Sequence, residues 1–417
     1  MQDIISLTAK PRLHATIQLP SSKSISNRAL VINALAGNKL LPQNVSDCDD
    51  TRVMLQWLTA DAVPDVIDIG AAGTAMRFSA ALLAVQPGTH TLTGTERMQN
   101  RPIAILVDAL RQLGANIAYI NKEGFPPLRI TGRPAAAAGG MALTLSGSVS
   151  SQYISALLMI GPAIGGLTLT LEGNIVSVPY IDMTLSIMRD FGAQCQWVDN
   201  HTLHVAAMPY RQQPYLVESD WSAASYWYEL VALTSDTDAE VCLPGLFQQS
   251  LQGDAEGARL FARLGVTTTH TQHDGQPAVL LRKGGDVARR LDYDFVNIPD
   301  LAQTFAVTCC MLGIPFHFTG LQSLKIKETD RIEALKTELR KMGYVLHDRN
   351  DCELMWDGER CPADADIIID TYDDHRMAMA FAPAALVLDT LRVRHPEVVS
   401  KSYPRFWQDV ACVMNYQ

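Results

Sequence analysis

Basic residues stand close to the points where apolar helices are expected to begin. Lys23 and Arg28 flank one such point in Ser21–Arg28 (SSKSISNR), and Gly70–Arg77 (GAAGTAMR) supplies a glycine-flanked turn into a second. A helix N-terminus exposes free N–H groups and the positive end of its dipole, which favours bound anions. The combination predicts a site for phosphate or carboxylate groups, although a glycine-rich turn alone usually indicates only a tight helix entry.

Small polar side chains cluster at the same helix entries. Gly147–Gln152 (GSVSSQ) places three serines and a glutamine ahead of an apolar helix, where hydroxyl and N–H groups suit a bound phosphate. A plain N-cap accounts for one serine without a ligand, and Ser24, Ser26 and Asn27 are open to the same interpretation. Three serines in so short a segment favour the ligand.

Acidic and basic residues mix in further segments. In Lys327–Arg331 (KETDR) the two basic residues are four apart on one helix face, which in isolation indicates a solvated ion-pair face. Asp373–Arg376 (DDHR) instead precedes a helix that is apolar on every side. His375 is therefore expected at a buried helix start, which favours a functional histidine over a solvated one. Lys401, close to Tyr403–Phe406, is compatible with simple packing of the C-terminal segment.

Two kinds of helix are needed to position these residues. One kind is nearly apolar all round and therefore expected in the interior; its six starts are predicted at Ser24, Thr74, Ser151, Ser222, Ala302 and Arg376. The other is amphipathic and ends on a glycine suited to a left-handed conformation; it is predicted within Val107–Ile117, Thr184–Cys195, Glu256–Thr267 and Ile332–Leu346, with weaker candidates at Thr51–Leu58 and Phe406–Met414.

The spacing of the helices indicates an internal repeat. The glycines that end the four amphipathic segments, Gly114, Gly192, Gly265 and Gly343, are separated by 78, 73 and 78 residues. Alternating strands are expected between the helices, for example at Ala142–Leu145, Leu167–Leu171 and Ile367–Asp370. The pattern predicts an α/β protein built from six two-helix units of about 70 residues each.

Bulk composition limits the number of domains and the class of partner. At 417 residues and 47% hydrophobic content, the chain exceeds what one core usually sustains, so two domains are expected, with a hinge near Leu216–Ser219. The formal net charge of −10 argues against nucleic acid or an anionic membrane as the main partner. A local cationic site for small anions remains compatible with that average.

Nothing in the sequence suggests secretion, a membrane span or a structural metal. The eight cysteines are scattered without a C-x-x-C pair or a cysteine–histidine cluster, which predicts reduced thiols. The first residues show no leader pattern, and apolar stretches such as Phe305–Phe318 are interrupted by threonines, a glycine and a proline. A cytoplasmic location is expected.

Taken in order, the segments resemble the EPSP synthase family, whose members are 3-phosphoshikimate 1-carboxyvinyltransferases. The matching motifs cover nearly the whole chain, and about nine of them in the right order make coincidence untenable. They are KSISNRAL (Lys23–Leu30), AGTAMR (Ala72–Arg77), RM-x-x-RPI (Arg97–Ile103), VDALRQLGA (Val107–Ala115), GSVSSQ (Gly147–Gln152), VPYIDMTL (Val178–Leu185), IPD (Ile298–Asp300), KETDR (Lys327–Arg331) and DHRMAMAF (Asp374–Phe381).

The resemblance implies a fold and a domain organisation. The family fold is a two-domain, inside-out α/β barrel of six βαβαββ units in two groups of three, and its chain crosses between the domains twice. Carried onto this sequence, one domain is residues 20–219 and holds the shikimate 3-phosphate site. The second combines residues 1–19 with 220–417, and the active site is expected in the cleft between the two domains.

The resemblance also implies the reaction and the residues that bind its substrates. The family moves the enolpyruvyl group of phosphoenolpyruvate onto the 5-hydroxyl of shikimate 3-phosphate, on the route to chorismate and the aromatic amino acids. Expected phosphoenolpyruvate ligands are Lys23, Gly73, Thr74, Arg101, Gln152, Arg331, Arg376 and Lys401. Expected shikimate 3-phosphate ligands are Lys23, Ser24, Arg28, Ser150, Ser151, Gln152, Ser177, Tyr180, Asp300, Ser323 and Lys327.

Proton transfer requires acids and bases among these cations. Glu328 is the expected donor to C3 of the enol, and Asp300, with Lys23, the expected acceptor from the 5-hydroxyl. His375 is expected to assist the loss of phosphate as a hydrogen-bond donor. The resemblance implies no metal or organic cofactor, a monomer, and small-molecule partners only, with no nucleic acid or membrane. The resemblance also implies that the chain is a target of glyphosate, which occupies the phosphoenolpyruvate site in this family.

Four positions depart from the family pattern. The family usually has Asn at Ala71, Pro at Phe78, Lys at Val178 and Asn at Ser323. Ala71 and Ser323 lie at substrate positions of the family, so substrate and glyphosate affinity are expected to differ. The charged set is complete, which favours an active enzyme.

Two rival functions are open at this point. UDP-N-acetylglucosamine enolpyruvyl transferase shares the fold and the donor, but its family carries a reactive cysteine in a glycine-rich loop, and Gln86–Arg101 contains no cysteine. The second rival is a catalytically silent homologue that binds anions, which the four departures motivate. Turnover with each acceptor distinguishes the three.

Overall fold

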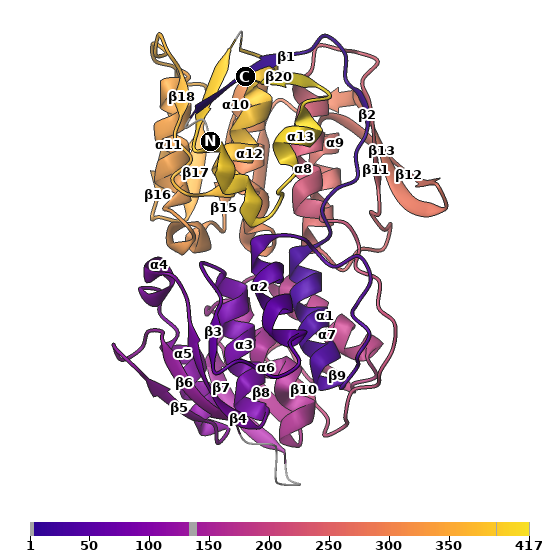
Figure 1. Ribbon diagram of the computed structural model, residues 1–417. Helices are drawn as coiled ribbons and strands as arrows, with labels where there is room; N and C mark the ends of the chain where they lie inside the picture. The colour runs from indigo at the N-terminus through magenta and orange to yellow at the C-terminus, as the bar shows by residue number, and fades with distance from the viewer. Residues whose placement is uncertain (1–3, 133–139, 389, 417) are drawn as a thin grey trace. The chain divides into compact units, whose positions relative to one another are not determined.

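The computed structural model describes residues 4–132, 140–388 and 390–416. The chain forms two compact units, whose elements Figure 1 labels. The inserted unit is Ser21–Val217, and the terminal unit joins Met1–Pro20 to Glu218–Gln417. Because both chain ends belong to the terminal unit, strand β1 (Ile4–Ala9) pairs with strands from the far end of the sequence.

Two four-stranded sheets of the inserted unit share one topology, with a parallel pair followed by two antiparallel strands. In the first, β3 (Val66–Asp68) pairs parallel with β4 (Gly88–Thr93), and β6 (Leu128–Gly132) and β5 (Asn116–Tyr119) follow. The second has the same order, namely β7 (Met141–Ser146), β8 (Leu167–Glu172), β10 (Thr202–Val205) and β9 (Cys195–Trp197).

Three sheets of the terminal unit repeat this topology. One sheet has the order β14 (Leu291–Asp294), β15 (Phe316–Thr319), β17 (Glu353–Trp356) and β16 (His347–Arg349). The next has the order β2 (His14–Thr16), β11 (Glu240–Pro244), β13 (Gln276–Val287) and β12 (Leu264–His273). The last has the order β18 (Ile368–Ile369), β19 (Leu391–Arg394), β1 and β20 (Met414–Tyr416). In each sheet the first two strands are parallel and the later pairs antiparallel. The recurrence of one topology confirms an internal repeat of α/β units.

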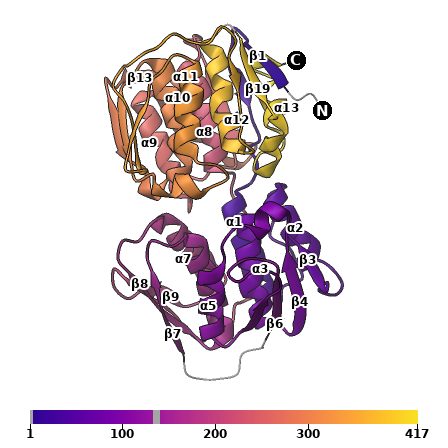
Figure 2. The ribbon, with the colours of Figure 1, turned by 90° about the vertical axis from the view of Figure 1, so that its left-hand side faces the viewer.

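The six predicted apolar helices all form, and each begins within one residue of its predicted start. They are α1 (Lys23–Leu35), α3 (Gly73–Val85), α6 (Ser151–Ile160), α8 (Trp221–Leu233), α10 (Ala302–Leu312) and α12 (His375–Phe381). Almost every residue of α3 and α10 is buried, as expected for helices without a polar face. In Figure 2, α8, α10 and α12 occupy the interior of the terminal unit, with β13 on one side and β1 and β19 on the other.

Amphipathic helices form the second predicted set. They are α2 (Asp49–Leu58), α5 (Ala104–Gln112), α7 (Val178–Asp190), α9 (Gly257–Ala262), α11 (Arg331–Lys341) and α13 (Phe406–Val410). All four predicted end glycines have positive φ, for example +91° at Gly114 and +88° at Gly343. A short extra helix, α4 (Glu96–Gln99), precedes α5. One strand face packs on helices and the other meets solvent, as the alternating burial of β8 illustrates.

One of the six units differs from the other five. Helices α1 and α2 pack against each other, but in the described residues no sheet accompanies them. An isolated parallel bridge between Gln43 and Leu216 takes its place. The six-unit α/β architecture is therefore confirmed, with five units carrying a full sheet.

All eight cysteines are free thiols, as their scattered pattern in the sequence predicts. Among the described helices, none combines the length and the apolar character that a membrane crossing requires.

Candidate functional site

In the inserted unit, the N-terminal turn of α1 carries Lys23 and Ser24. Ser22 caps the helix, since its Oγ accepts a hydrogen bond from the Ile25 N–H at 3.4 Å. The Lys23 Nζ lies 4.0 Å from Oδ2 of the buried Asp50, and 19% of the Lys23 side chain is exposed. Ser22, rather than Ser24 or Ser26, therefore provides the cap, which leaves the hydroxyl of Ser24 outside that role.

Arg28 is fully enclosed one turn further along α1. Its guanidinium donates to the Thr184 Oγ1 at 2.7 Å, the Ser155 Oγ at 3.0 Å and the Tyr180 carbonyl at 3.4 Å. These acceptors are neutral, and burial lowers the pKa of Arg28 to about 10. The guanidinium also lies over the ring of Phe78 at 5.4 Å. A buried cation with neutral neighbours is suited to attract a carboxylate.

Gly73, at the first turn of α3, lies against two guanidinium groups. A Cβ at this position would be 2.8 Å from Nη1 of Arg77 and 2.8 Å from Nη1 of Arg101. The Arg77 Nη1 donates to the Gly73 carbonyl at 2.8 Å, while the buried Nε of Arg77 has no hydrogen-bond partner in the described part of the chain. Sequence reasoning placed Arg101 here but missed Arg77, although the AGTAMR motif contains it.

Residues from α3 and α6 meet at their N-terminal turns. The Gln152 Nε2 donates to the Thr74 Oγ1 at 3.1 Å. Ser150 is exposed and caps α6, since its Oγ accepts from the Gln152 N–H at 3.4 Å, while Ser151 is buried. One serine of the predicted cluster is thus a plain cap, as the simpler interpretation of GSVSSQ allows.

Ser177 stands at the start of α7 in a strained backbone conformation. Its φ is +56° and its side chain makes no capping hydrogen bond to the helix. A non-glycine residue in the left-handed region costs free energy and is often found at functional sites. Tyr180, in the next turn, contacts Arg28 through its carbonyl and places its ring 5.9 Å from the guanidinium.

In the terminal unit, Arg331 is the centre of an ion-pair network. It begins α11, is 1% exposed, and donates to Asp374 Oδ2 at 2.7 Å, Glu328 Oε2 at 3.0 Å and Asp300 Oδ1 at 3.1 Å. Burial alone would lower the pKa of Arg331, but these carboxylates raise it. The KETDR segment therefore joins a partly buried ion-pair network through Arg331, instead of forming a solvated ion-pair face.

Asp374 holds this network together, and sequence reasoning did not single it out. It is fully buried, takes both Nε and Nη2 of Arg331, and caps α12 by accepting from the Arg376 N–H at 2.9 Å. The Nδ1 of His375 lies 3.6 Å from its Oδ1. The Asp in the DHR motif was the available signal, but its partner Arg331 is 43 residues away in sequence.

Asp300 is surrounded by three cations. Arg376 Nη2 lies 3.0 Å from its Oδ2, and Arg331 Nη1 and Lys327 Nζ lie 3.1 and 3.4 Å from its Oδ1. Burial would raise the pKa of Asp300, but Arg376, Lys327 and Arg331 together hold it well below its ordinary value. Asp300 is therefore a carboxylate at neutral pH, which is the form that accepts a proton.

Glu328 is also ionised. Its Oε1 accepts from Lys401, and Oε2 accepts from Arg331. Burial would raise its pKa, but Arg331, Lys401 and His375 hold the pKa of Glu328 well below its ordinary value. In this arrangement Glu328 holds no proton, so it has to gain one before it can act as an acid.

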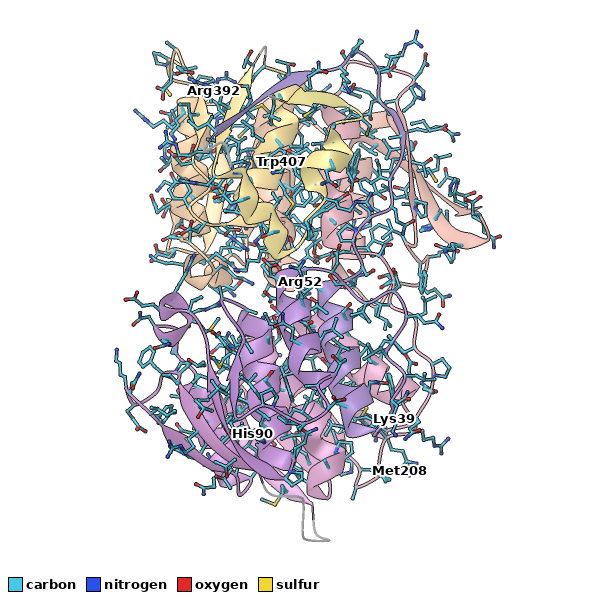
Figure 3. All side chains as sticks on the ribbon, viewed as in Figure 1. Lys39, Arg52, His90, Met208, Arg392 and Trp407 are labelled. Carbon is cyan, nitrogen blue, oxygen red and sulfur yellow. The ribbon has the colours of Figure 1, made fainter. Side chains whose placement is uncertain are left out.

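The segment that carries Lys401 is anchored by a tryptophan. Lys401 ends the 3-10 helix η7 (Pro396–Lys401), and Trp407, labelled in Figure 3, donates its Nε1–H to the Pro396 carbonyl at 2.7 Å. This contact closes the turn between η7 and α13. Lys401 is thus held by a folded turn, beyond the simple C-terminal packing that the sequence also allowed.

Two of the four departures from the family pattern, Ala71 and Ser323, differ in burial. Ala71 is exposed next to the turn into α3. Ser323 lies in the 3-10 helix η5 (Gln322–Ile326), and its buried Oγ has no hydrogen-bond partner in the described residues. Serine there supplies a shorter polar group than the asparagine usual in the family.

A sequence model of EPSP synthase (3-phosphoshikimate 1-carboxyvinyltransferase) matches residues 7–61 and 59–410. Among curated proteins, a 3-phosphoshikimate 1-carboxyvinyltransferase of Bacteroides fragilis (strain ATCC 25285) is 59% identical over 405 residues, covering 97% of this chain and 96% of that protein. One from Vibrio cholerae serotype O1 (strain M66-2) is 37% identical over 438 residues, covering 97% and 99%.

Solved structures show the same fold at low sequence identity. An EPSP synthase from Acinetobacter baumannii superposes with a TM-score of 0.79 at 20% identity, covering 99% of each chain. The likeness of architecture agrees with the inside-out α/β organisation of both units.

Proposed function

The chain belongs to the EPSP synthase family, and on that premise we propose that it transfers the enolpyruvyl group of phosphoenolpyruvate to the 5-hydroxyl of shikimate 3-phosphate, with release of phosphate. The observation that carries the proposal is the family match over nearly the whole chain. The cation-rich helix starts of both units support it, because both substrates are multiply charged anions.

We propose that the inserted unit binds most of shikimate 3-phosphate. Ser150, Ser151 and Ser177 stand at helix starts where hydroxyl and backbone N–H groups suit the phosphate. Arg28, with its neutral partners, is suited to the ring carboxylate, and Ser24 and Tyr180 flank it. Gly73 and the adjacent Arg101, with Thr74 and Gln152 nearby, are suited to bind phosphoenolpyruvate.

The terminal unit contributes cations and the proton-transfer groups in this proposal. Arg331, Arg376 and Lys401 are assigned to phosphoenolpyruvate, and Lys327 and Ser323 to the shikimate end. In the structure, the carboxylates Asp300, Glu328 and Asp374 form ion pairs with these cations. An incoming trianion therefore competes with internal carboxylates, which lowers its net gain in binding energy.

The proton steps follow from that competition. When Lys401 and Arg331 turn toward the substrate, the pKa of Glu328 rises and it can take a proton to deliver to C3 of the enol. Asp300, helped by Lys23, accepts the proton of the 5-hydroxyl while the hydroxyl oxygen forms a bond to C2 of phosphoenolpyruvate. Loss of phosphate with a proton from C3 then restores the double bond, and His375 donates a hydrogen bond to the leaving group.

We also propose which cofactors, oligomeric state and location the enzyme has. Addition and elimination need only proton transfers, so no metal or organic cofactor is required. We propose a cytoplasmic monomer, and size-exclusion chromatography with light scattering tests the monomer.

Turnover tests the function against its rivals. Phosphate release is expected with phosphoenolpyruvate plus shikimate 3-phosphate and not with phosphoenolpyruvate plus UDP-N-acetylglucosamine. Release only with the nucleotide sugar would assign the chain to the other enolpyruvyl transferase. Absence of release with either, together with saturable binding of shikimate 3-phosphate, would assign it to a silent anion-binding homologue.

A further inference from the structure

Asp254 is a buried carboxylic acid that none of the roles above uses. It lies in the 3-10 helix η2 (Gly253–Glu256), directly before α9, and is 5% exposed. Its Oδ2 accepts a hydrogen bond from the Ser222 Oγ in the first turn of α8. Its Oδ1 has no hydrogen-bond partner in the part of the chain that the structure describes. A buried carboxylate with one hydroxyl partner is poorly stabilised as an anion.

The charged groups around Asp254 belong to the proposed catalytic network. Asp300 and Asp220, from η4 (Pro299–Leu301) and the cap of α8, disfavour a negative charge on Asp254, while Arg376 from α12 favours it. On α9, which packs against η2, Arg259 is exposed and paired with Glu256. Burial and Asp300 prevail over Arg376 and raise the pKa of Asp254 to about 7.

The charge of Asp254 therefore bears on the Arg376–Asp300 pair, whose atoms are 3.0 Å apart. When Asp254 is neutral, the positive charge of Arg376 is opposed by its ion pair with Asp300. When Asp254 is ionised, a second carboxylate in a water-poor environment opposes the same guanidinium. Charge interactions of this kind are strong in a buried site because little solvent screens them.

We propose that Asp254 is a positioning residue that acts through Arg376 and Asp300, so that its neutral form favours phosphoenolpyruvate binding and its ionised form competes with the substrate. The inference rests on the proposed function and on the assignment of Arg376 to phosphoenolpyruvate. Binding and protonation are linked reciprocally, so phosphoenolpyruvate binding draws a proton onto Asp254 above neutral pH.

The test compares Asp254→Asn with the wild type in the KM for phosphoenolpyruvate between pH 6 and 9, at saturating shikimate 3-phosphate. Asparagine has the same shape and no charge. The wild-type KM is expected to rise by about tenfold between pH 7 and 8.5, since one pH unit above a controlling pKa changes binding by at most tenfold. The variant is expected to stay flat over that range. Titration of the substrate phosphates near pH 6 affects both proteins alike, so it cancels in the ratio of their KM values.

Two further variants separate this role from a structural one. Glu229→Gln changes a different buried carboxyl, about two turns after Ser222 on α8, and is expected to keep the wild-type pH profile. Ser222→Ala removes the hydroxyl that stabilises the ionised form of Asp254, so the rise in KM is expected at higher pH. This variant also carries the test if Asp254→Asn does not fold.

The outcomes are distinguishable. Parallel pH profiles of the wild type and Asp254→Asn, or an unshifted profile for Ser222→Ala, overturn the inference while wild-type turnover still supports the function. Isothermal titration of phosphoenolpyruvate in buffers of different ionisation enthalpy provides a second readout at pH 8. Proton uptake by the wild type that is missing in Asp254→Asn supports the inference, and equal uptake by both contradicts it.

Discussion

Replacing Gly73 by alanine tests whether the start of α3 shapes the proposed phosphoenolpyruvate site. The added Cβ would lie 2.8 Å from Nη1 of both Arg77 and Arg101, and 3.2 Å from Cζ of Arg101. Carbon contacts are optimal at about 3.5–4.0 Å, so each guanidinium has to move by roughly 0.7 Å or more. Arg77 is hydrogen-bonded to the Gly73 carbonyl at 2.8 Å, so the larger displacement is expected at Arg101.

The magnitude follows from what Arg101 contributes to an anion. A hydrogen bond to a charged group is worth about 1.5–3 kcal/mol, so losing its alignment weakens binding by about 10- to 150-fold. We expect the KM for phosphoenolpyruvate to rise by at least about tenfold. Glyphosate is predicted to inhibit the wild type competitively against phosphoenolpyruvate, and its Ki is expected to rise at least as much in Gly73→Ala.

The assay measures phosphate release across both substrates, with and without glyphosate. Ser79→Ala, on the same helix and equally buried, is the matched control, because its Oγ has no hydrogen-bond partner in the described residues. It should leave both constants unchanged. Unaltered KM and Ki in Gly73→Ala would refute the reasoning, as would inhibition that phosphoenolpyruvate cannot relieve.

Three other changes test separate parts of the argument. Glu328→Gln is expected to lower kcat by about 10²-fold or more, the usual contribution of a general acid, while shikimate 3-phosphate still binds by calorimetry; near-wild-type turnover removes Glu328 from that role. Asp374→Asn leaves the buried Arg331 short of a counter-ion, so the free energy of unfolding should fall by about 3–5 kcal/mol in urea titrations, whereas a loss below about 1 kcal/mol would contradict the role of Asp374 in holding the network together. Burial raises the pKa of Glu229, so the folded state holds a proton that the unfolded chain releases above about pH 4.5; wild-type stability should decline as the pH rises above that value, with Glu229 contributing up to about 1.4 kcal/mol per pH unit, and Glu229→Gln should decline less steeply because Asp254 still contributes, with parallel stability curves as the refuting result.

Helix positions followed from local sequence because their causes are local. Apolar residues on every face predict a buried helix wherever they occur, and small polar residues before them mark its start. The starts of α3 and α6 therefore agreed with the structure to within one residue. The glycines that follow the amphipathic helices could be predicted in the same way, because a positive φ after a helix strongly favours glycine.

Motif recognition and tertiary structure contributed differently to the site. The charged set of candidate site residues, including Asp300 and Arg331, came from the resemblance to the family, and its substrate roles stay predictions. The protonation states of these residues could not be predicted from sequence. The low pKa of Asp300 arises from Arg376 and Lys327, and both of these cations are distant from Asp300 in the chain. A solvated face was the better local interpretation of KETDR, and only burial against α12 overturned it.

What the sequence determined by itself is the class of protein, because helix periodicity, end glycines and ordered motifs depend on neighbouring residues. What the tertiary structure decided is the charge of each group. Asp374 and Asp254 were not predicted as site residues, because each is defined by a partner that is distant in the sequence. The physical reason is that burial and paired charges set a pKa, and both are properties of packing rather than of sequence order.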